Sequence, residues 1–351
     1  MNDFDWWFSL LNISSKIKLK MLDQYKSTDN VWCELSKSSI YKEQYNKEKI
    51  DAIKRVIEEK SIKVVNFNDE KYPKNLKILE DAPFLIFYKG EIEKLNFGYN
   101  ISIIGSRNCT NYGLSVTKII SKALAEHNIP VISGMAKGID AQAHKSTIES
   151  GGYTCAVLGC GVDVIYPKEN AKIYKEILEN GCVISEFMPG TTPISFNFPI
   201  RNRIISALSE IIIVVEAGTK SGSLITVRLA LDQGKNVMTV PGSIFSEQSK
   251  GTNQLIKDGA EPILSVQDIF SFAGLNLIET NTKIKNKEDN LNKLECKLNN
   301  IINNNPIHID DIIKISNIDI KRVYELLFEM QFKNEILCLS GNYYVRINDK
   351  I

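Results

Sequence analysis

The sequence has 351 residues, which is enough for two or three domains of about 100–200 residues each. Its 43 Lys and Arg residues nearly balance its 42 Asp and Glu residues, so no global basic field attracts a polyanion, and any nucleic-acid site must be a local patch. No apolar run reaches the roughly 20 residues that cross a bilayer, and no signal peptide is evident, so we expect no membrane segment.

The first 62 residues are predicted to form a small helical domain. Apolar residues recur there at helical spacing, most clearly over 50–57. An extended region begins at Val64, and turn-forming Pro and Gly residues surround an apolar strand over 84–88. We therefore place a domain boundary between residues 62 and 63.

A strand, helix and strand unit is predicted over 101–104, 114–126 and 130–133. Small residues and cations lie at the ends of both strands: Gly105, Ser106 and Arg107 at the first, Ser133, Gly134 and Lys137 at the second. Small residues allow the backbone to approach an anion, helix N-termini supply N–H donors, and arginine can bind a phosphate through two parallel hydrogen bonds. The unit therefore predicts a site for a phosphorylated ligand.

Strands and helices continue to alternate as far as residue 274. Further strands are predicted over 154–158, 182–185, 211–215 and 237–240, with helices over 171–179, 201–208 and 223–233. Apolar, β-branched strands separated by helices indicate a mostly parallel sheet that is covered on both faces. The fold class is therefore α/β, with an extended Rossmann-like domain over 63–274.

A second cluster of cations and small residues flanks the strand over 211–215. It consists of Phe198, Arg201, Asn202 and Arg203 before the strand, and Ser221, Gly222 and Ser223 after it. Ligands of open α/β sheets bind at the carboxyl ends of strands, where both clusters fall. Only seven of the 43 cations are arginines, so arginines in both clusters favour a bidentate phosphate contact. The alternative is that Arg201 and Arg203 form structural ion pairs.

The C-terminal part is predicted to be a separate domain. A polar, lysine-rich stretch over 275–290 has the composition of a linker. Helical segments and a hairpin follow over 291–351, in the order found in a winged helix. The helix in the position of a recognition helix carries Lys321 and Arg322 but also Glu325 and Glu329, so protein contact is an alternative to DNA contact.

Neither a metal site nor a disulfide is expected. The seven cysteines are scattered without a C-x-x-C pair, which indicates reduced thiols in a cytoplasmic protein. Asp140 and His144 are spaced as two residues on one helix face, but no third metal ligand is evident. We interpret Asp140 as a helix cap.

The central segments closely resemble the DNA-processing protein A (DprA, or Smf) family. The matching motifs cover roughly half of the chain and include 105–107, 133–140, 198–205, 221–226, 240–242 and 251–260. The resemblance implies an extended Rossmann fold that binds single-stranded DNA, protects incoming DNA during natural transformation and loads the RecA recombinase. It also implies a homodimer. By motif, the phosphate pocket maps onto the residues of the two clusters described above.

Two aromatic residues flank the cations of the second cluster. Phe196 and Phe198 can stack on bases, a contact worth about 1–3 kcal/mol per base. The alternative is that at least one of them packs in the core.

Two enzyme alternatives are weaker. The fold also resembles the lysine-decarboxylase-like phosphoribohydrolases, whose Gly-Gly-x-Gly-Thr-x-x-Glu motif places a glutamate near the sugar, whereas this chain has Thr226 there. Glu216 precedes the turn, so glycosidic cleavage has no placed acid. A dinucleotide-dependent oxidoreductase would need G-x-G-x-x-G in the first turn, which is absent. We expect no catalytic residues and no cofactor.

Overall fold

The computed structural model describes residues 1–275, 294, 297–303, 305–332, 335–339 and 341–346. It contains two compact units, Met1–Leu277 and Ile278–Ile351. Nearly all of the predicted linker over 275–290 lies outside the described residues. The domain boundaries expected from the sequence therefore stay predictions.

The first unit begins with five helices: α1 (Asp3–Leu10), α2 (Ser15–Tyr25), α3 (Thr28–Leu35), α4 (Ser39–Lys42) and α5 (Lys47–Glu59). Polar side chains cap most of them, because a side-chain oxygen satisfies backbone N–H groups that have no partner within the first turn. A capping box at Asn2 starts α1, for example. Trp6, Trp7 and Phe8 are buried in one cluster with Phe84 and Phe87, so these helices share a core with the following sheet.

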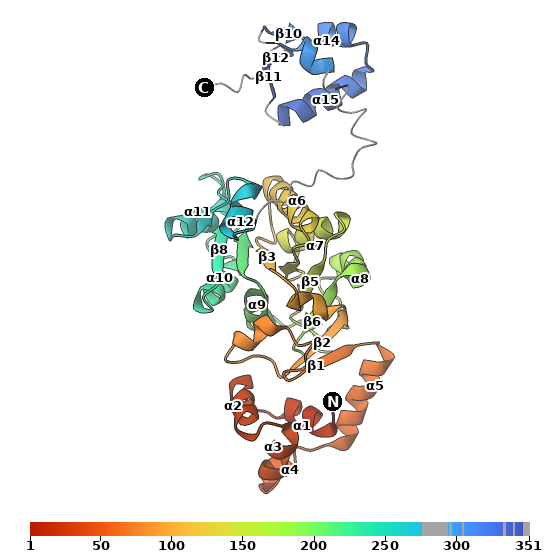
Figure 1. The fold of residues 1–351 in the computed structure, drawn as a ribbon, viewed down its shortest axis with the longest axis vertical. Coiled ribbons are helices and arrows are strands. Elements are labelled where there is room, and N and C mark those ends of the chain that lie inside the picture. The colour runs from red at the N-terminus through yellow and green to blue at the C-terminus, as the bar shows by residue number, and fades with distance from the viewer. Residues whose placement is uncertain (276–293, 295–296, 304, 333–334, 340, 347–351) are drawn as a thin grey trace. The chain divides into compact units, whose positions relative to one another are not determined.

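A nine-stranded sheet follows, in the order β1-β2-β6-β5-β4-β3-β7-β8-β9 (Figure 1). The strands are β1 (Lys63–Asn66), β2 (Leu85–Gly90), β3 (Ile101–Ile104), β4 (Val131–Ser133), β5 (Thr154–Val157), β6 (Cys182–Ser185), β7 (Ile211–Val214), β8 (Asn236–Thr239) and β9 (Glu261–Pro262). Strand β2 pairs antiparallel with both β1 and β6, and all other pairs are parallel. The predicted α/β fold with a mostly parallel sheet is confirmed.

Helices cover both faces of this sheet (Figure 1). They are α6 (Asn111–Glu126), α7 (Ile139–Glu149), α8 (Ala171–Asn180), α9 (Asn197–Leu208), α10 (Ser223–Asp232), α11 (Lys250–Lys257) and α12 (Val266–Phe272). Side chains alternate along β3: Ile101 and Ile103 pack with α6 and α7, whereas Ile104 packs with α9. Every side chain of β3 is buried, as expected for a strand covered on both faces. Short 3₁₀ helices span Lys74–Ile78, Ile92–Asn96, Lys168–Asn170 and Glu247–Ser249.

The order of the strands creates a crevice at the ends of β3 and β7. From β3 the chain progresses through β4 and β5 to β6, and then returns to β7 on the other side of β3. The loops that leave β3 and β7 therefore turn away from each other. Ligands of open α/β sheets bind at such a switch point.

The second unit contains α14 (Ile309–Ser316), α15 (Ile320–Phe332), β10 (Ile307–His308), β11 (Ile336–Leu339) and β12 (Tyr343–Arg346). Its three strands form an antiparallel sheet in the order β10-β12-β11. Ile312, Leu326 and Met330 are buried between these elements. The predicted hairpin is present, but the helix expected over 291–303 lies partly outside the described residues, and the winged-helix assignment stays a prediction. In the part of the chain described, no helix is both long and apolar enough to cross a bilayer.

Candidate functional site

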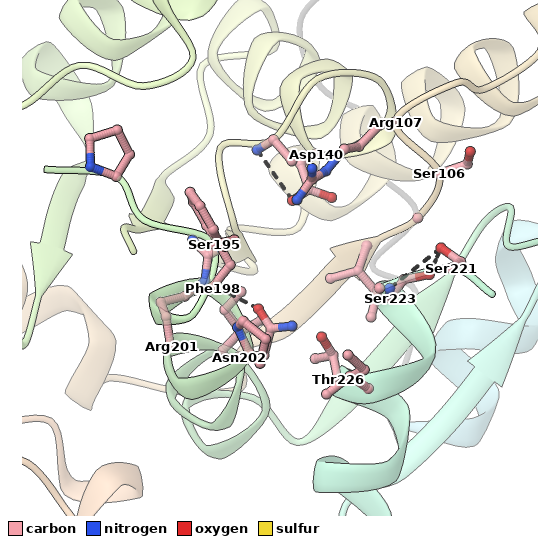
Figure 2. A pocket seen from close by; sticks show the side chains of 18 of the residues that line it. Ser106, Arg107, Asp140, Ser195, Phe198, Arg201, Asn202, Ser221, Ser223 and Thr226 are labelled. Carbon is pink, nitrogen blue, oxygen red and sulfur yellow. Dashed lines mark hydrogen bonds between the residues drawn. The ribbon is translucent and has the colours of Figure 1, made fainter. Parts of the chain in front are cut away.

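A cavity of about 610 Å³ opens at the carboxyl ends of β3 and β7. Figure 2 shows three walls: the loop after β3 with Ser106 and Arg107, helix α9 with Phe198 and Arg201, and the start of α10 with Ser221 and Ser223. Nine of the residues predicted from the sequence line it: Gly105, Ser106, Arg107, Phe198, Arg201, Asn202, Ser221, Gly222 and Ser223. The cavity therefore joins the two predicted clusters, which lie far apart in the sequence.

The loop after β3 is held from two sides. The backbone oxygen of Ser106 accepts a hydrogen bond from the N–H of Ile139, over 3.2 Å. The hydroxyl of Ser106 donates to Oε1 of Gln248, over 2.8 Å. Arg107 extends from this fixed loop, is exposed, and places its guanidinium carbon 5.9 Å from the ring centre of Phe198. A phosphate can therefore reach Arg107 without rearrangement of the loop.

Arg201 lies in the floor of the cavity. Its side chain is buried, and its Nη1 donates hydrogen bonds to the backbone oxygens of Gly134, over 2.8 Å, and Val157. Its Nε donates to Oδ1 of Asn202, over 3.2 Å. These bonds position Arg201 firmly but leave it fewer free donors than Arg107.

Asp140 faces Arg201 across Gly134. A Cβ atom on Gly134 would lie 2.8 Å from both Nη2 of Arg201 and Oδ2 of Asp140, so only glycine allows the two charges to approach there. The Asp140 carboxylate also accepts hydrogen bonds from the N–H groups of Gly134 and Ala136. Asp140 is thus not the N-cap of α7, contrary to our interpretation of the sequence, since Gly138 occupies that position.

Burial shifts the titration of both charged groups. Desolvation lowers the pKa of Arg201 to about 10, although Asp140 opposes this shift, so the guanidinium stays charged at neutral pH. Desolvation raises the pKa of Asp140 above its usual range, and the charge of Arg201 counteracts this. Because Asp140 offsets part of the charge of Arg201, the exposed Arg107 is the more available cation for an anionic ligand.

The third wall is the N-terminus of α10. Ser221, Gly222 and Ser223 lie there, and Gly222 has no side chain to cap the helix. The hydroxyls of Ser221 and Ser223 are 2.8 Å apart. A helix N-terminus carries partial positive charge, which favours a bound anion. The first N–H groups of α10 are bonded to Ser221 and Gly222, so the two serine hydroxyls are the side-chain donors of this wall. The cavity thus presents anion-binding groups on opposite walls.

Residues 63–274, which carry all three walls, match the family model described as DNA recombination-mediator protein A. The chain belongs to this family. The resemblance predicted from the sequence is therefore confirmed.

Curated relatives and solved structures agree. The DNA processing protein DprA of Streptococcus pneumoniae is 43% identical over 204 residues, which are 58% of this chain and 71% of that protein. An X-ray structure of DprA from S. pneumoniae has a TM-score of 0.69 at 32% identity, covering 77% of this chain and 98% of that one. A structure of Helicobacter pylori DprA that concerns its single-stranded DNA binding mode has a TM-score of 0.56 at 31% identity, covering 61% and 97%.

Four predicted site residues of this family member lie outside the cavity lining: Ser133, Gly134, Lys137 and Arg203. Ser133 is fully buried and its hydroxyl donates to the backbone oxygen of Ile103. Gly134 lies behind the lining, between Arg201 and Asp140. These two residues support the walls rather than face the ligand.

The two remaining cations are engaged elsewhere. Lys137 is exposed and forms an ion pair with Glu169. Arg203 is buried, with its Nη2 2.5 Å from Oε2 of Glu186 and its Nε 3.1 Å from Oδ2 of Asp81. The alternative of a structural ion pair thus describes Arg203. Arg203 also lies on a different face of α9 from Phe198, Arg201 and Asn202, which line the cavity.

Several lining residues are not among those predicted from the sequence. Asn108, Tyr166, Ser195 and Thr226 line the cavity together with Asp140. The ring of Tyr166 lies 5.5 Å from that of Phe198, so the cavity contains an aromatic pair. Tyr166 stands in a predicted loop after a strand, and this placement is the signal that would have marked it.

Glu216 is committed to a structural role. It is buried, and its two carboxylate oxygens accept hydrogen bonds from the N–H of Thr110, over 2.8 Å, and from the hydroxyl of Thr110, over 2.6 Å. It thereby fixes the start of α6 and does not line the cavity. Within the described residues, no group of His, Cys, Asp and Glu is arranged to hold a metal ion.

His144 is buried near Arg201, and its hydrogen bonds show which ring nitrogen carries the proton. The Thr154 hydroxyl donates to the backbone oxygen of Val131, so it accepts from Nδ1 of His144, over 2.7 Å. Among the described residues, no hydrogen-bond partner reaches Nε2. Desolvation, aided by the charge of Arg201, lowers the pKa of His144 to about 3.

We expect this histidine to make stability fall with acidification. Between pH 6.5 and about 3, the unfolded chain binds a proton at this position that the folded chain excludes. Lowering the pH from 7 to 5 should therefore remove about 2 kcal/mol of unfolding free energy. Denaturant titrations at several pH values should show a shallower pH dependence in His144→Asn, whose amide can replace Nδ1. An equal pH dependence in both proteins would contradict the assignment.

Proposed function

We propose that this chain binds single-stranded DNA in the cavity between β3, α9 and α10. The observation that carries the proposal is the exposed Arg107 beside the ring of Phe198, on a loop fixed by Ser106. A cation and an aromatic face side by side match a phosphate and its adjacent base. The relative from H. pylori, a member of the same family, has a reported single-stranded DNA binding mode.

The chemistry favours a single strand over a duplex. In a duplex the base faces are stacked on one another and cannot reach the rings of Phe198 and Tyr166, whereas an unpaired base can stack there. Arg107 and the serine hydroxyls at the start of α10 provide the phosphate contacts, which carry no sequence information. We therefore expect binding with little sequence preference and strong dependence on salt.

The proposal includes a cellular role. As a DNA recombination mediator, the protein would act in the cytoplasm as a homodimer, protect incoming DNA during natural transformation and load RecA onto it. The family membership supports this role, and the dimer and the RecA contact are part of the proposal.

We also propose that the cavity is not an enzyme active site. Asp140 is the one acidic residue among the described residues that line it, and it faces the charge of Arg201 across Gly134. Thr226 occupies the position of the phosphoribohydrolase glutamate, and Glu216 is bound to Thr110. A general acid for glycosidic cleavage is therefore missing from this part of the structure.

Replacing Arg107 with alanine should weaken binding of single-stranded DNA without loss of the fold. The side chain is exposed, so folding does not depend on it, and each lost phosphate contact flattens the plot of log affinity against log salt by about 0.7. Fluorescence anisotropy with a labelled oligonucleotide at several salt concentrations measures both effects. Arg55→Ala, an exposed arginine on α5, is the matched control and should bind normally. An unchanged affinity and salt slope in Arg107→Ala would refute the proposed site.

A further inference from the structure

The loop that follows β8 projects two apolar side chains into solvent. Phe245 is 90% exposed and Ile244 is 77% exposed. Single exposed apolar residues are common on protein surfaces and need no explanation. Two adjacent ones at the tip of one loop, beside a candidate binding site, are a more specific feature.

Both ends of this loop are fixed. Gly242 donates its N–H to Oδ1 of Asn253, over 3.1 Å, and accepts from Nδ2 of the same residue, over 3.0 Å. At the other end, the backbone oxygen of Gln248 accepts from the N–H of Ala217, over 2.8 Å. The tip itself is closed by a bond from the N–H of Ser246 to the backbone oxygen of Ser243. The exposed side chains are thus held on a defined turn.

The same loop is joined to the cavity wall. The Oε1 of Gln248 accepts a hydrogen bond from the hydroxyl of Ser106, which lines the cavity next to Arg107. The hydroxyl of Tyr112 donates to the backbone oxygen of Pro241, at the start of the loop, over 3.0 Å. Strand β8 lies beside β7, and β7 lies beside β3, from which the loop with Arg107 leaves. Neighbouring strands are about 4.8 Å apart, so β3 and β8 end about 10 Å apart, a span that a few nucleotides can cover.

We propose that Phe245 stacks on a base of the same DNA strand that occupies the cavity, and so extends the site along the carboxyl edge of the sheet to β8. The inference rests on the proposed function of the cavity. A DNA base is the fitting occupant because the tip offers an uncharged aromatic face. The loop is also bonded to the cavity wall that carries Arg107, the cation proposed to bind phosphate. Any base can stack on an aromatic ring, which agrees with a site that has little sequence preference.

The test compares two oligonucleotide lengths. A thymidine strand of about 4 nucleotides fills the cavity alone, and one of about 20 also spans the loop. Phe245→Ala should lower affinity for the long strand about tenfold, which corresponds to about 1.4 kcal/mol, and leave the short strand unchanged. Its salt slope should stay that of wild type because no phosphate contact is lost, whereas Arg107→Ala should weaken both lengths and flatten the slope.

Substitutions at the same position separate stacking from other contacts. Phe245→Trp should retain the affinity for the long strand, and Phe245→Leu should lose it. Phe97→Ala removes another exposed aromatic ring, 73% exposed, and should bind both lengths normally. An unchanged long-strand affinity in Phe245→Ala, or an equal loss on both lengths, would overturn the inference. If wild type binds neither length, the proposed function itself fails.

Discussion

Replacing Arg201 with alanine is expected to lower the free energy of unfolding by about 3 kcal/mol or more, because it leaves a buried opposite charge uncompensated. Arg201 is buried, and its removal leaves the Asp140 carboxylate in the floor of the cavity without its cation. The backbone oxygens of Gly134 and Val157 also lose a donor. Denaturant unfolding of the variant against wild type measures the loss.

A double variant shows whether the opposite charges of Arg201 and Asp140 are the cause. Asp140→Leu alone should also destabilise, because it leaves the guanidinium uncompensated. Combining it with Arg201→Met removes both buried charges, so neither is left uncompensated. We therefore expect the double variant to be more stable than either single variant. A loss of less than 1 kcal/mol in Arg201→Ala would show that Arg201 contributes little to stability, and strictly additive losses would show that the two residues act independently.

Much of the central fold follows from patterns that are local in the sequence. The strand over 101–104 is apolar on both faces because helices cover both faces, and it was predicted at its observed limits. Helix α9 was predicted to begin at Arg201, whereas it begins at Asn197. The reason is Pro199, which is usually read as a helix breaker but is tolerated in the first turn, where its missing N–H has no partner to lose. The local sequence alone does not show whether Pro199 ends a helix or lies in its first turn.

The candidate site was predictable only in part, for a physical reason. Small residues and arginines after strands identified two clusters, and the strand order brought them to one cavity. Composition could not tell Arg107, Arg201 and Arg203 apart, although the first is exposed, the second is in the cavity floor and the third is paired with Glu186. Burial and pairing depend on residues distant in sequence, so they appear only in the folded structure.

Gly138→Ala is expected to disturb the site through the backbone. Gly138 has a φ of 78° and a ψ of −125°, a conformation that is essentially restricted to glycine. A Cβ atom there would also lie 2.4 Å from the backbone oxygen of Ser106 and 2.7 Å from that of Arg107. Because backbone atoms cannot swing aside, the loop that carries Arg107 must move. We expect a loss of about 3 kcal/mol in unfolding free energy or more, from strain and overpacking together, and weaker binding of single-stranded DNA.

Gly151→Ala is the matched control, because it separates strain from displacement of the loop. Gly151 also has a positive φ, of 74°, but a Cβ atom there would meet nothing within 4 Å. Its replacement should cost about 1–2 kcal/mol through left-handed strain alone and leave DNA affinity unchanged. Unfolding titrations and DNA binding, measured for both variants under conditions where each is folded, make the comparison. If folded Gly138→Ala bound single-stranded DNA as tightly as Gly151→Ala does, the position of the loop after β3 would not matter for binding, and the placement of Arg107 in the proposed site would be wrong.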